Sequence, residues 1–303
     1  MQDLIEAKNT LSFLKEHGIS AKKKYGQNFL IDKRVLDRII EGAGISKEDT
    51  VLEIGPGIGT LTQALCLRAG KVIAVEIDKD MIPLLQENLS GLDNYEIINE
   101  DILKLDLKEM FGASSPLREG TDFKNGESIG GLKVVANLPY YITTPIIIEL
   151  LESGAGFDSI TVMVQKEVAE RMQAGPGGKD YGALTLLVRY YSEAEVIANV
   201  PPNSFIPRPG VDSAVIKLSL LKKPRVETED PGRLFAIIRA AFSQRRKTLS
   251  NALKNDAALK IPREKTEEAL ETMGLKTDIR GERLSLEEFA ELSRLIRQGR
   301  EEI

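Results

Sequence analysis

Four consecutive residues, Asn137-Leu138-Pro139-Tyr140, could hold the exocyclic amine of a nucleobase. They follow an apolar run, Val134 to Ala136, and so stand where a strand would end. The Asn side-chain oxygen and a backbone carbonyl of the turn can each accept one N–H, and the Tyr ring can lie on the face of the base. Two acceptors on the amine hydrogens favour a pyramidal nitrogen and return electron density to its lone pair. Because these residue types are also common in ordinary turns, the interpretation depends on their surroundings.

A Gly-rich turn upstream has the spacing of a cofactor-binding loop. Residues 51–60 read Val-Leu-Glu-Ile-Gly-Pro-Gly-Ile-Gly-Thr, a short apolar run that enters the turn. Glycine lets the backbone approach a ligand that a Cβ would exclude. A dinucleotide fingerprint has the spacing G-x-G-x-x-G, whereas here Thr60 stands where its third Gly belongs. The spacing of Gly55 and Gly57, with the acidic Glu53 before them, suits S-adenosylmethionine better, because that cofactor carries an amino acid and a sulfonium and no pyrophosphate.

Acidic residues end the next two expected strands. Glu76 ends a strand expected over 71–77, about 20 residues after the first Gly of the turn, where a carboxylate can bind ribose hydroxyls. Asp101 follows a strand expected over 95–99 and can accept the amino group of the cofactor adenine. The Gly-rich turn, Glu76, Asp101 and Asn137 would thus lie at the carboxyl ends of four successive strands, where open parallel sheets bind ligands.

Composition limits the class of protein. The 303 residues suffice for one α/β domain and a smaller one. There is no apolar run of the ~18 residues that a membrane span requires, and we expect no secretory leader. The single cysteine, Cys66, and the single histidine, His17, exclude a disulfide framework, clustered Cys or His metal ligands and a Ser-His-Asp triad. We expect a metal-free, cytoplasmic monomer in which Cys66 is a small buried residue.

The formal net charge of −5 hides an uneven distribution. Residues 15–38 carry seven Lys/Arg against three Asp/Glu, residues 200–254 carry eleven against four, and residues 255–303 carry nine against twelve. Charge runs are often only solvated faces, but basic stretches near a predicted site, with acidity elsewhere, are compatible with contacts to RNA phosphates. The residues that we expect to contact RNA are Lys22, Lys23, Lys24, Arg245, Arg246 and Lys247.

Local signals predict several elements around these motifs. A helix is expected from Leu61 to Ala69, with Thr60 as its N-cap and Gly70 just beyond its last turn. Two late strands, over 194–200 and 213–220, are expected to form a hairpin at one edge of the sheet. Apolar residues at helical spacing after residue 231 predict an all-α segment.

Together these residues resemble the bacterial small-subunit (16S) rRNA adenine N6,N6-dimethyltransferase family, whose relatives include the resistance methylases of large-subunit rRNA. The resemblance runs from about Lys22 to Leu292. Its motifs are Gly26–Leu30, Glu53–Gly59, Glu76–Asp78, Asp101, Asn137–Tyr140, Gln165–Met172, Phe205–Pro209 and Ala241–Lys247.

The resemblance implies a role for each matching residue. The cofactor-binding residues that it implies are Asn28, Leu30, Gly55, Gly57, Glu76, Asp101 and Asn137. The catalytic residues that it implies are Asn137, Leu138, Pro139, Tyr140 and Phe205. Asn28 and Leu30 would close over the methionine end of S-adenosylmethionine. Tyr140 would stack on the target base, and Phe205 would be a second aromatic residue in the base pocket.

The implied targets are two adjacent adenines in the loop of the hairpin near the 3′ end of the small-subunit rRNA. Each would receive two methyl groups, so that four cofactor molecules are consumed. No general base stands among the motif residues, and we expect catalysis to rest on positioning and hydrogen bonding. Residues 112–131 depart from the family pattern as an enlarged Gly/Ser-rich loop without a motif residue.

The fold implied is α/β, a Rossmann-like S-adenosylmethionine-dependent methyltransferase sheet with a small C-terminal all-α domain. We expect a basic N-terminal arm in residues 1–40, the methyltransferase domain in 41–222 and a helical RNA-binding or accessory domain in 231–303.

Three other functions stay open at this point. The chain could be a resistance-type methylase of large-subunit (23S) rRNA, which has the same chemistry and another substrate. It could act mainly as a ribosome-assembly factor that binds an immature small subunit. A DNA adenine methylase is a weaker alternative, because such enzymes favour an acidic residue where Asn137 stands.

Overall fold

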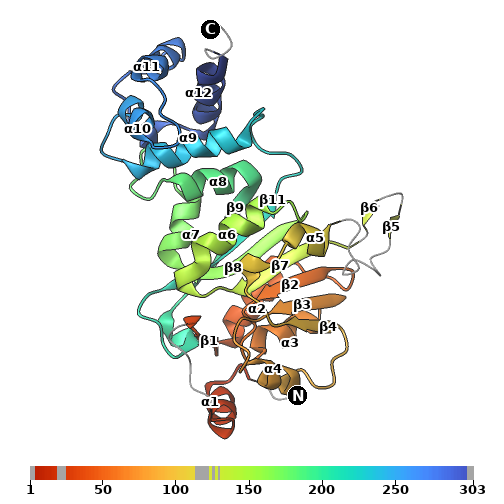
Figure 1. Ribbon diagram of the computed structural model, residues 1–303. Coiled ribbons are helices and arrows are strands. Elements are labelled where there is room, and N and C mark those ends of the chain that lie inside the picture. The colour runs from red at the N-terminus through yellow and green to blue at the C-terminus, as the bar shows by residue number, and fades with distance from the viewer. Residues whose placement is uncertain (1–3, 19–24, 113–122, 125–126, 129, 299–303) are drawn as a thin grey trace. The chain divides into compact units, whose positions relative to one another are not determined.

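The computed structural model describes residues 4–18, 25–112, 123–124, 127–128 and 130–298 (Figure 1). The chain divides into two compact units. The first contains residues 1–169 and 194–220, and the second contains residues 170–193 and 221–303.

A seven-stranded mixed sheet forms the centre of the first unit. Its strand order is β4-β3-β2-β7-β8-β11-β9. The strands are β2 (Thr50–Ile54), β3 (Lys71–Val75), β4 (Tyr95–Ile98), β7 (Leu132–Asn137), β8 (Ser159–Gln165), β9 (Ser192–Val200) and β11 (Ser213–Leu220). The first five strands of this order pair in parallel, and β11 pairs antiparallel with β8. The two late strands therefore lie at one edge of the sheet, as the sequence predicts.

The order of the strands fixes where a ligand can bind. The chain runs from β2 outward to β3 and β4, then returns to place β7 on the other side of β2. Loops that leave the carboxyl ends of β2 and β7 therefore diverge, and an open α/β sheet binds its ligands at such a switch point. The Gly-rich turn follows β2, and Asn137 is the last residue of β7.

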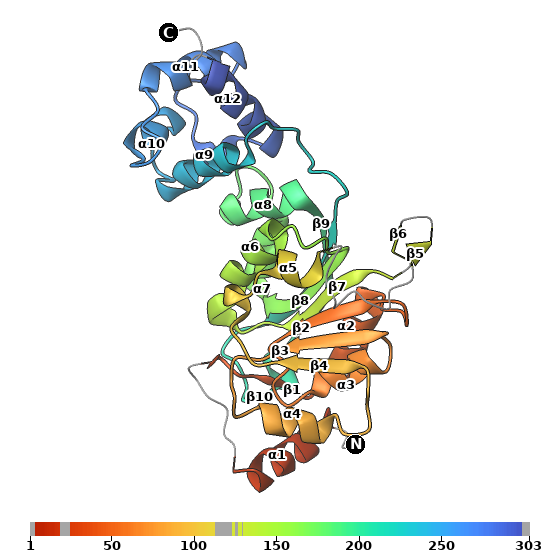
Figure 2. The same cartoon turned by 45° about the vertical axis from the view of Figure 1, so that its right-hand side comes forward.

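Helices lie on both sides of this sheet (Figure 2). They are α2 (Lys33–Ala43), α3 (Thr60–Cys66), α4 (Ile82–Asn88), α5 (Leu107–Phe111) and α6 (Thr143–Glu152), while α7 (Lys166–Gln173) follows β8 directly. One core cluster joins α2 and α3 to the sheet through residues such as Leu36, Ile39, Leu65 and Val135. Cys66, a free cysteine, is buried in this cluster as expected.

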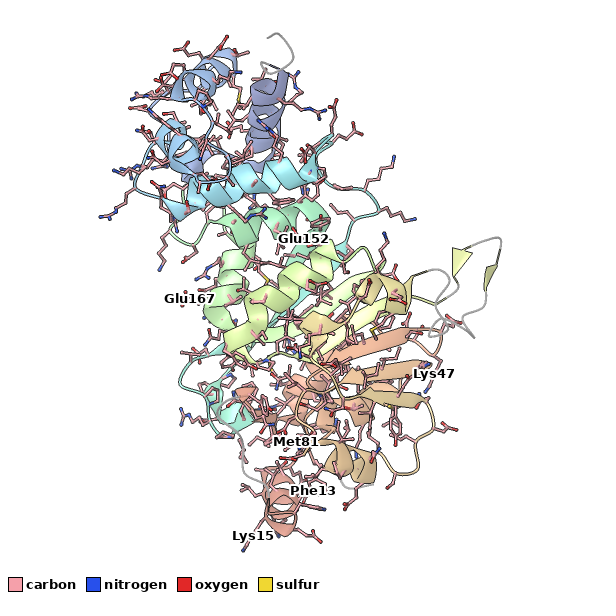
Figure 3. The ribbon with its side chains drawn as sticks, viewed as in Figure 1. Phe13, Lys15, Lys47, Met81, Glu152 and Glu167 are labelled. Atoms are coloured by element: carbon pink, nitrogen blue, oxygen red, sulfur yellow. The ribbon has the colours of Figure 1, made fainter. Side chains whose placement is uncertain are left out.

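The N-terminal helix α1 (Ala7–Glu16) packs against residues that follow β2 and β3. Phe13 and Leu14 form a buried cluster with Phe29, Ile58 and Met81. Figure 3 labels Phe13 and Met81 of this cluster and also Lys15, which is exposed. Next along the chain, β1 (Phe29–Leu30) pairs antiparallel with β10 (Phe205–Ile206).

The second unit is helical. Besides the end of α7 it contains α8 (Ala183–Tyr191), α9 (Pro231–Ser243), α10 (Leu249–Asn255), α11 (Arg263–Thr272) and α12 (Leu286–Gln298). The Tyr181 hydroxyl donates to the Leu284 carbonyl at 2.8 Å, and the Tyr181 ring meets that of Phe242 edge-on, with the ring centroids 5.8 Å apart. The Asp230 carboxylate accepts from Arg233 N–H and caps α9.

The α/β fold with a helical C-terminal part agrees with the sequence-based expectation, and several details differ. Residues 170–193 cluster with the C-terminal helices, although we expected them inside 41–222; the functional limits of the three predicted domains stay a prediction. Within residues 112–131, Phe123–Lys124 (β5) pairs with Glu127–Ser128 (β6), and residues 113–122, 125–126 and 129 lie outside the described residues.

The predicted caps of α3 are wrong at both ends. Gly59, with φ +89°, is the N-cap, while the Thr60 hydroxyl is buried without a hydrogen-bond partner among the described residues. The helix ends at Cys66, with Leu67 as its C-cap. Glycine is required at position 70 for another reason: a Cβ there would lie 2.4 Å from the Lys47 carbonyl oxygen.

Candidate active site

One cavity lies at the switch point between β2 and β7. It has about 830 Å³ of empty space, its open mouth included. Nine of the predicted site residues line it: Asn28, Leu30, Gly55, Gly57, Glu76, Asn137, Leu138, Pro139 and Tyr140. The fold thus gathers residues from four separate segments of the sequence.

Glu76 holds the Gly-rich turn in shape. Its Oε2 accepts the Gly57 N–H at 3.0 Å, and its Oε1 accepts the Asp78 N–H at 2.8 Å. Gly55 and Gly57 have φ of +68° and +58°, and a Cβ on Gly57 would lie 3.3 Å from the Phe29 ring. Burial raises the pKa of Glu76, which is 4% exposed. A carboxylate oxygen can accept more than one hydrogen bond, so Glu76 retains acceptor capacity for a ligand hydroxyl.

Glu53 is a buried carboxyl at the floor of the same cavity. It is 1% exposed, and its Oε2 has no hydrogen-bond partner among the described residues. Burial, together with the smaller effect of the nearby Glu76 charge, raises the pKa of Glu53 to about 8. A carboxylate in this position is stabilised by a cation, and the ammonium group of an amino-acid cofactor has the right charge. The sequence marked Glu53 as part of the loop pattern, but we did not expect it among the ligands.

Asp101 lines an adjoining slot rather than the main cavity. The slot is walled by apolar side chains from Ile77, Ile102 and Pro139 and by the Tyr141 ring. Asp101 Oδ1 accepts the Leu103 N–H at 3.1 Å at the start of a short 3-10 helix, Ile102–Lys104. The second carboxylate oxygen can accept from an amino group. Apolar walls and one acceptor at the rim suit a purine ring with an exocyclic amine.

The Asn137 turn leaves two acceptors for a ligand. Asn137 Nδ2 donates to the Asn28 carbonyl at 3.0 Å, which leaves its Oδ1 as an acceptor. The Pro139 carbonyl is already used, because it accepts the Ile142 N–H at 3.2 Å and the Thr143 hydroxyl at 3.0 Å. No donor to the Leu138 carbonyl is found in the described part of the chain. The acceptors left for an amine are therefore Asn137 Oδ1 and the Leu138 carbonyl.

Aromatic residues lie at the cavity in a different set from the predicted one. The structure does not bring Phe205 to the cavity. Phe205 pairs with Leu30, and its side chain, 2% exposed, lies in the core cluster that contains α2. Tyr140 does line the cavity. Tyr25 and Tyr141 also line it, and Tyr141 is 58% exposed. In the sequence, only their positions could have indicated a role at the site: Tyr141 follows Tyr140, and Tyr25 precedes Gly26.

The predicted RNA-binding residues lie elsewhere in the chain. Arg245, Arg246 and Lys247 belong to the second unit and are exposed. The Arg245 guanidinium donates to the Lys179 carbonyl at 2.8 Å and lies 3.2 Å from the Glu282 carboxylate. Lys22, Lys23 and Lys24 lie outside the described residues. Within the described ranges, no group of three or more His, Cys, Asp or Glu side chains could hold a metal ion, and no helix is long and apolar enough to cross a membrane.

Fold and site together define the class. The cavity combines a Gly-rich turn, the buried Glu76 carboxylate bonded to that turn and an Asn-Leu-Pro-Tyr turn. This combination is typical of a Rossmann-like S-adenosylmethionine-dependent methyltransferase. Residues 18–298 match the family described as ribosomal RNA adenine dimethylase. The chain belongs to this family.

Relatives over nearly the whole length agree with this assignment. The chain is 54% identical to "Ribosomal RNA small subunit methyltransferase A" of Lachnoclostridium phytofermentans, over 98% of each chain. It is 50% identical to the protein of that name from Clostridium botulinum strain Langeland, over 94% of this chain and 97% of the relative.

Two solved structures are similar as well. A dimethyladenosine transferase from Plasmodium falciparum has a TM-score of 0.69 at 29% identity, over 87% of this chain and 95% of the other. The 23S rRNA methyltransferase ErmE has a TM-score of 0.64 at 27% identity, over 89% of this chain and all of the other.

Proposed function

We propose that this enzyme methylates N6 of two adjacent adenines in the 3′-terminal hairpin loop of small-subunit rRNA, to N6,N6-dimethyladenine. The observation that carries this proposal is that the Asn137 turn and the Gly-rich turn open into one cavity. The relatives at 50 and 54% identity are named for the small-subunit rRNA, which supports that substrate over the large-subunit one. Assembly of small subunits would place the enzyme in the cytoplasm, and we expect it to act as a monomer.

The cavity has groups for each part of S-adenosylmethionine. Glu76 would bind the ribose hydroxyls, Asp101 the adenine amine and Glu53 the ammonium group. Asn28 and Leu30 would lie over the methionine end, because the bond from Asn137 to the Asn28 carbonyl holds that segment against the cavity. When bound, the cofactor supplies an electrophilic methyl group.

The chain itself would orient the target base. An adenine extruded from its RNA stack would lie with its face on Tyr140. Asn137 Oδ1 and the Leu138 carbonyl would accept the two N6 hydrogens, which keeps the lone pair on the nitrogen and directs it into the cavity. Enclosure by Tyr25 and Tyr141 would keep water from the reacting atoms.

The titratable groups of the cavity make poor general bases. Asn137 cannot take a proton, and Glu53 and Glu76 are assigned to the cofactor. Burial raises the pKa of Tyr140, and burial followed by the charge of Asp101 raises that of Tyr141, so neither ring is a phenolate near neutral pH. We therefore infer that the proton leaves N6 to water after methyl transfer. A titrating protein base in the rate profile of the chemical step would contradict this inference.

The deciding experiment is methylation with methyl-labelled S-adenosylmethionine on three separate substrates: unmethylated small subunits, large-subunit rRNA and duplex DNA. Label only in small-subunit rRNA, recovered as N6,N6-dimethyladenine, is the expected result. Label in large-subunit rRNA would make this a methylase of the other subunit. Tight binding of small subunits without any label would make an assembly role primary.

A further inference from the structure

The Tyr140 side chain is hydrogen-bonded to Ser213, a residue from a distant part of the sequence. Its hydroxyl lies 2.6 Å from Ser213 Oγ, in a hydrogen bond in which either oxygen can donate. The hydroxyl is the only polar atom of the Tyr140 side chain. Ser213 follows the motif Phe205–Pro209, whose Phe205 the structure places in the core instead of the cavity.

Ser213 is a rigid anchor for this bond. It is fully buried, with 0% exposure, and is the first residue of β11. Its register partner is Gln165 of β8, and the adjacent Lys166 N–H donates to the Asp212 carbonyl at 3.0 Å. Because β11 runs antiparallel to β8, its first residue lies at the edge of the sheet where the parallel strands end. Ser213 is therefore fixed on the same edge as Asn137.

The turn sets the backbone of Tyr140, whereas the orientation of its half-buried ring depends on side-chain contacts. Pro139, with φ −60°, and the short helix Tyr140–Ile142 set the direction of the chain. Rotation about the side-chain bonds still leaves several staggered orientations. A side chain that binds a substrate in a reactive geometry has to be held within roughly 10–20° of the required orientation. The hydrogen bond to Ser213 selects one orientation of the ring.

We propose that Ser213 is a positioning residue that holds the Tyr140 ring in the orientation in which it stacks on the target adenine. This inference rests on the proposed function, because it takes Tyr140 as the residue that stacks on the base. The contact serves the target and not the cofactor. Its loss should therefore reduce kcat/KM for RNA and leave the affinity for S-adenosylmethionine unchanged.

A double-mutant cycle tests this role. Ser213→Ala and Tyr140→Phe each remove one hydroxyl of the pair, and each should lower kcat/KM on unmethylated small subunits by about three- to tenfold. Since both variants lose the same bond, the double variant should be no slower than the slower single one. The dissociation constant for S-adenosylmethionine, from calorimetry, should change less than about twofold. Losses that multiply in the double variant, or no loss in Ser213→Ala, would refute the role.

Ser159→Ala is the matched control. Ser159 is a buried serine at the other end of β8, in register with Ser219 of β11. Its removal should leave kcat/KM unchanged. A loss equal to that of Ser213→Ala would mean that any buried serine of these strands affects the rate through general stability.

A second measurement tests the contact without turnover. In protein labelled with 13C at tyrosine Cζ, seven tyrosines give resonances, and the one missing in Tyr140→Phe belongs to Tyr140. That resonance should move in Ser213→Ala, and a Tyr140 resonance that stays in place would refute the contact. A shifted resonance in an enzyme that fails to methylate small subunits would refute the proposed substrate while the contact stands.

Discussion

Single residues of the site are distinguished by which of their polar atoms are already bonded. The Pro139 carbonyl accepts two hydrogen bonds from the start of α6, and Asn137 Nδ2 is bonded to the Asn28 carbonyl. What remains is acceptor capacity, at Asn137 Oδ1 and the Leu138 carbonyl. A site of this kind selects a ligand group that donates hydrogen bonds and rejects one that must accept them.

Asn137→Ala should separate binding from chemistry. The variant loses an acceptor that acts on the reacting nitrogen, and we expect the single-turnover methylation rate to fall roughly 100-fold or more. Cofactor affinity should fall less, by the amount that the bond to the Asn28 carbonyl contributes. Rapid-quench kinetics and calorimetry measure the two quantities. Asn94→Ala is a suitable control, because Asn94 Nδ2 bonds the Cys66 and Ala69 carbonyls away from the cavity. Equal losses of rate and affinity in Asn137→Ala would contradict its assigned role.

Glu53 should make the cofactor-free protein less stable as pH rises. Its pKa goes from 4.5, the ordinary value, to about 8 when folded, so between these values the folded state binds a proton that the unfolded state has lost. Stability therefore falls with rising pH across this window, by up to ~1.4 kcal/mol per pH unit. Glu53→Gln removes this dependence. We expect its free energy of unfolding, relative to wild type, to rise by a few kcal/mol from pH 5 to pH 8.

Urea titrations of both proteins at several pH values measure that difference. Glu76, whose pKa burial also raises, is present in both proteins and so largely cancels. A difference that is constant from pH 5 to pH 8 would show that Glu53 is not buried as a neutral acid. Calorimetry of the same pair with S-adenosylmethionine should show weaker binding to Glu53→Gln, since the variant cannot become an anion.

Among the elements, the Gly-rich turn joins two functions in one short segment. Gly57 brings the backbone against Phe29 and the cavity, whereas Gly59 starts α3 against the buried Leu85 of α4. A Cβ on Gly59 would lie 2.7 Å from Leu85 Cδ1. The packing of α3 and α4 therefore requires Gly59, and the close approach of the turn to Phe29 favours Gly57.

Gly59→Ala should destabilise the fold more than Gly91→Ala. Both glycines have nearly the same φ, +89° and +90°, so both variants bear the same cost of a left-handed backbone. Only Gly59 has a neighbour to displace, because nothing lies within 4 Å of a Cβ on Gly91. We expect an additional loss of about 1–3 kcal/mol in the free energy of urea unfolding for Gly59→Ala. Equal losses would mean that Leu85 moves aside without cost.

The elements also show what sequence can and cannot predict. Runs such as 71–75 and 132–137 indicate strands by composition, and the order of motifs indicates the edge of the sheet where Glu76 and Asn137 meet. The caps of α3 were not predictable in this way, because Gly59 is required by Leu85 and Gly70 by the Lys47 carbonyl, both from other segments. Phe205 was misplaced for a similar reason: its pairing with Leu30 decides which way it points.

At the scale of the whole molecule, the net charge of −5 is unexpected for a protein that acts on RNA. Local groups of basic residues therefore have to supply the contacts to RNA phosphates. The basic residues of the second unit differ in the contacts that they make within the protein. Arg245 is bonded to the carbonyls of Gly178 and Lys179 and paired with Glu282, so it stabilises its own unit. Arg246 and Lys247 are exposed beside it, just before α10. These contacts give Arg245 a structural role, and a phosphate-binding role for its two exposed neighbours stays a prediction.

Arg246→Ala and Lys247→Ala should each weaken binding of small-subunit RNA and reduce its dependence on salt. Each phosphate contact contributes about 0.7–0.9 to the slope of log K against log salt, so each variant should lower the slope by about one. Cofactor affinity should be unchanged. Lys276→Ala removes an exposed charge from the acidic C-terminal stretch and should leave the slope as it is. Arg245→Ala should instead lower the free energy of unfolding, by on the order of 1 kcal/mol, because it leaves backbone carbonyls without a donor. If all four variants changed the slope equally, RNA binding would depend on total charge and not on this segment.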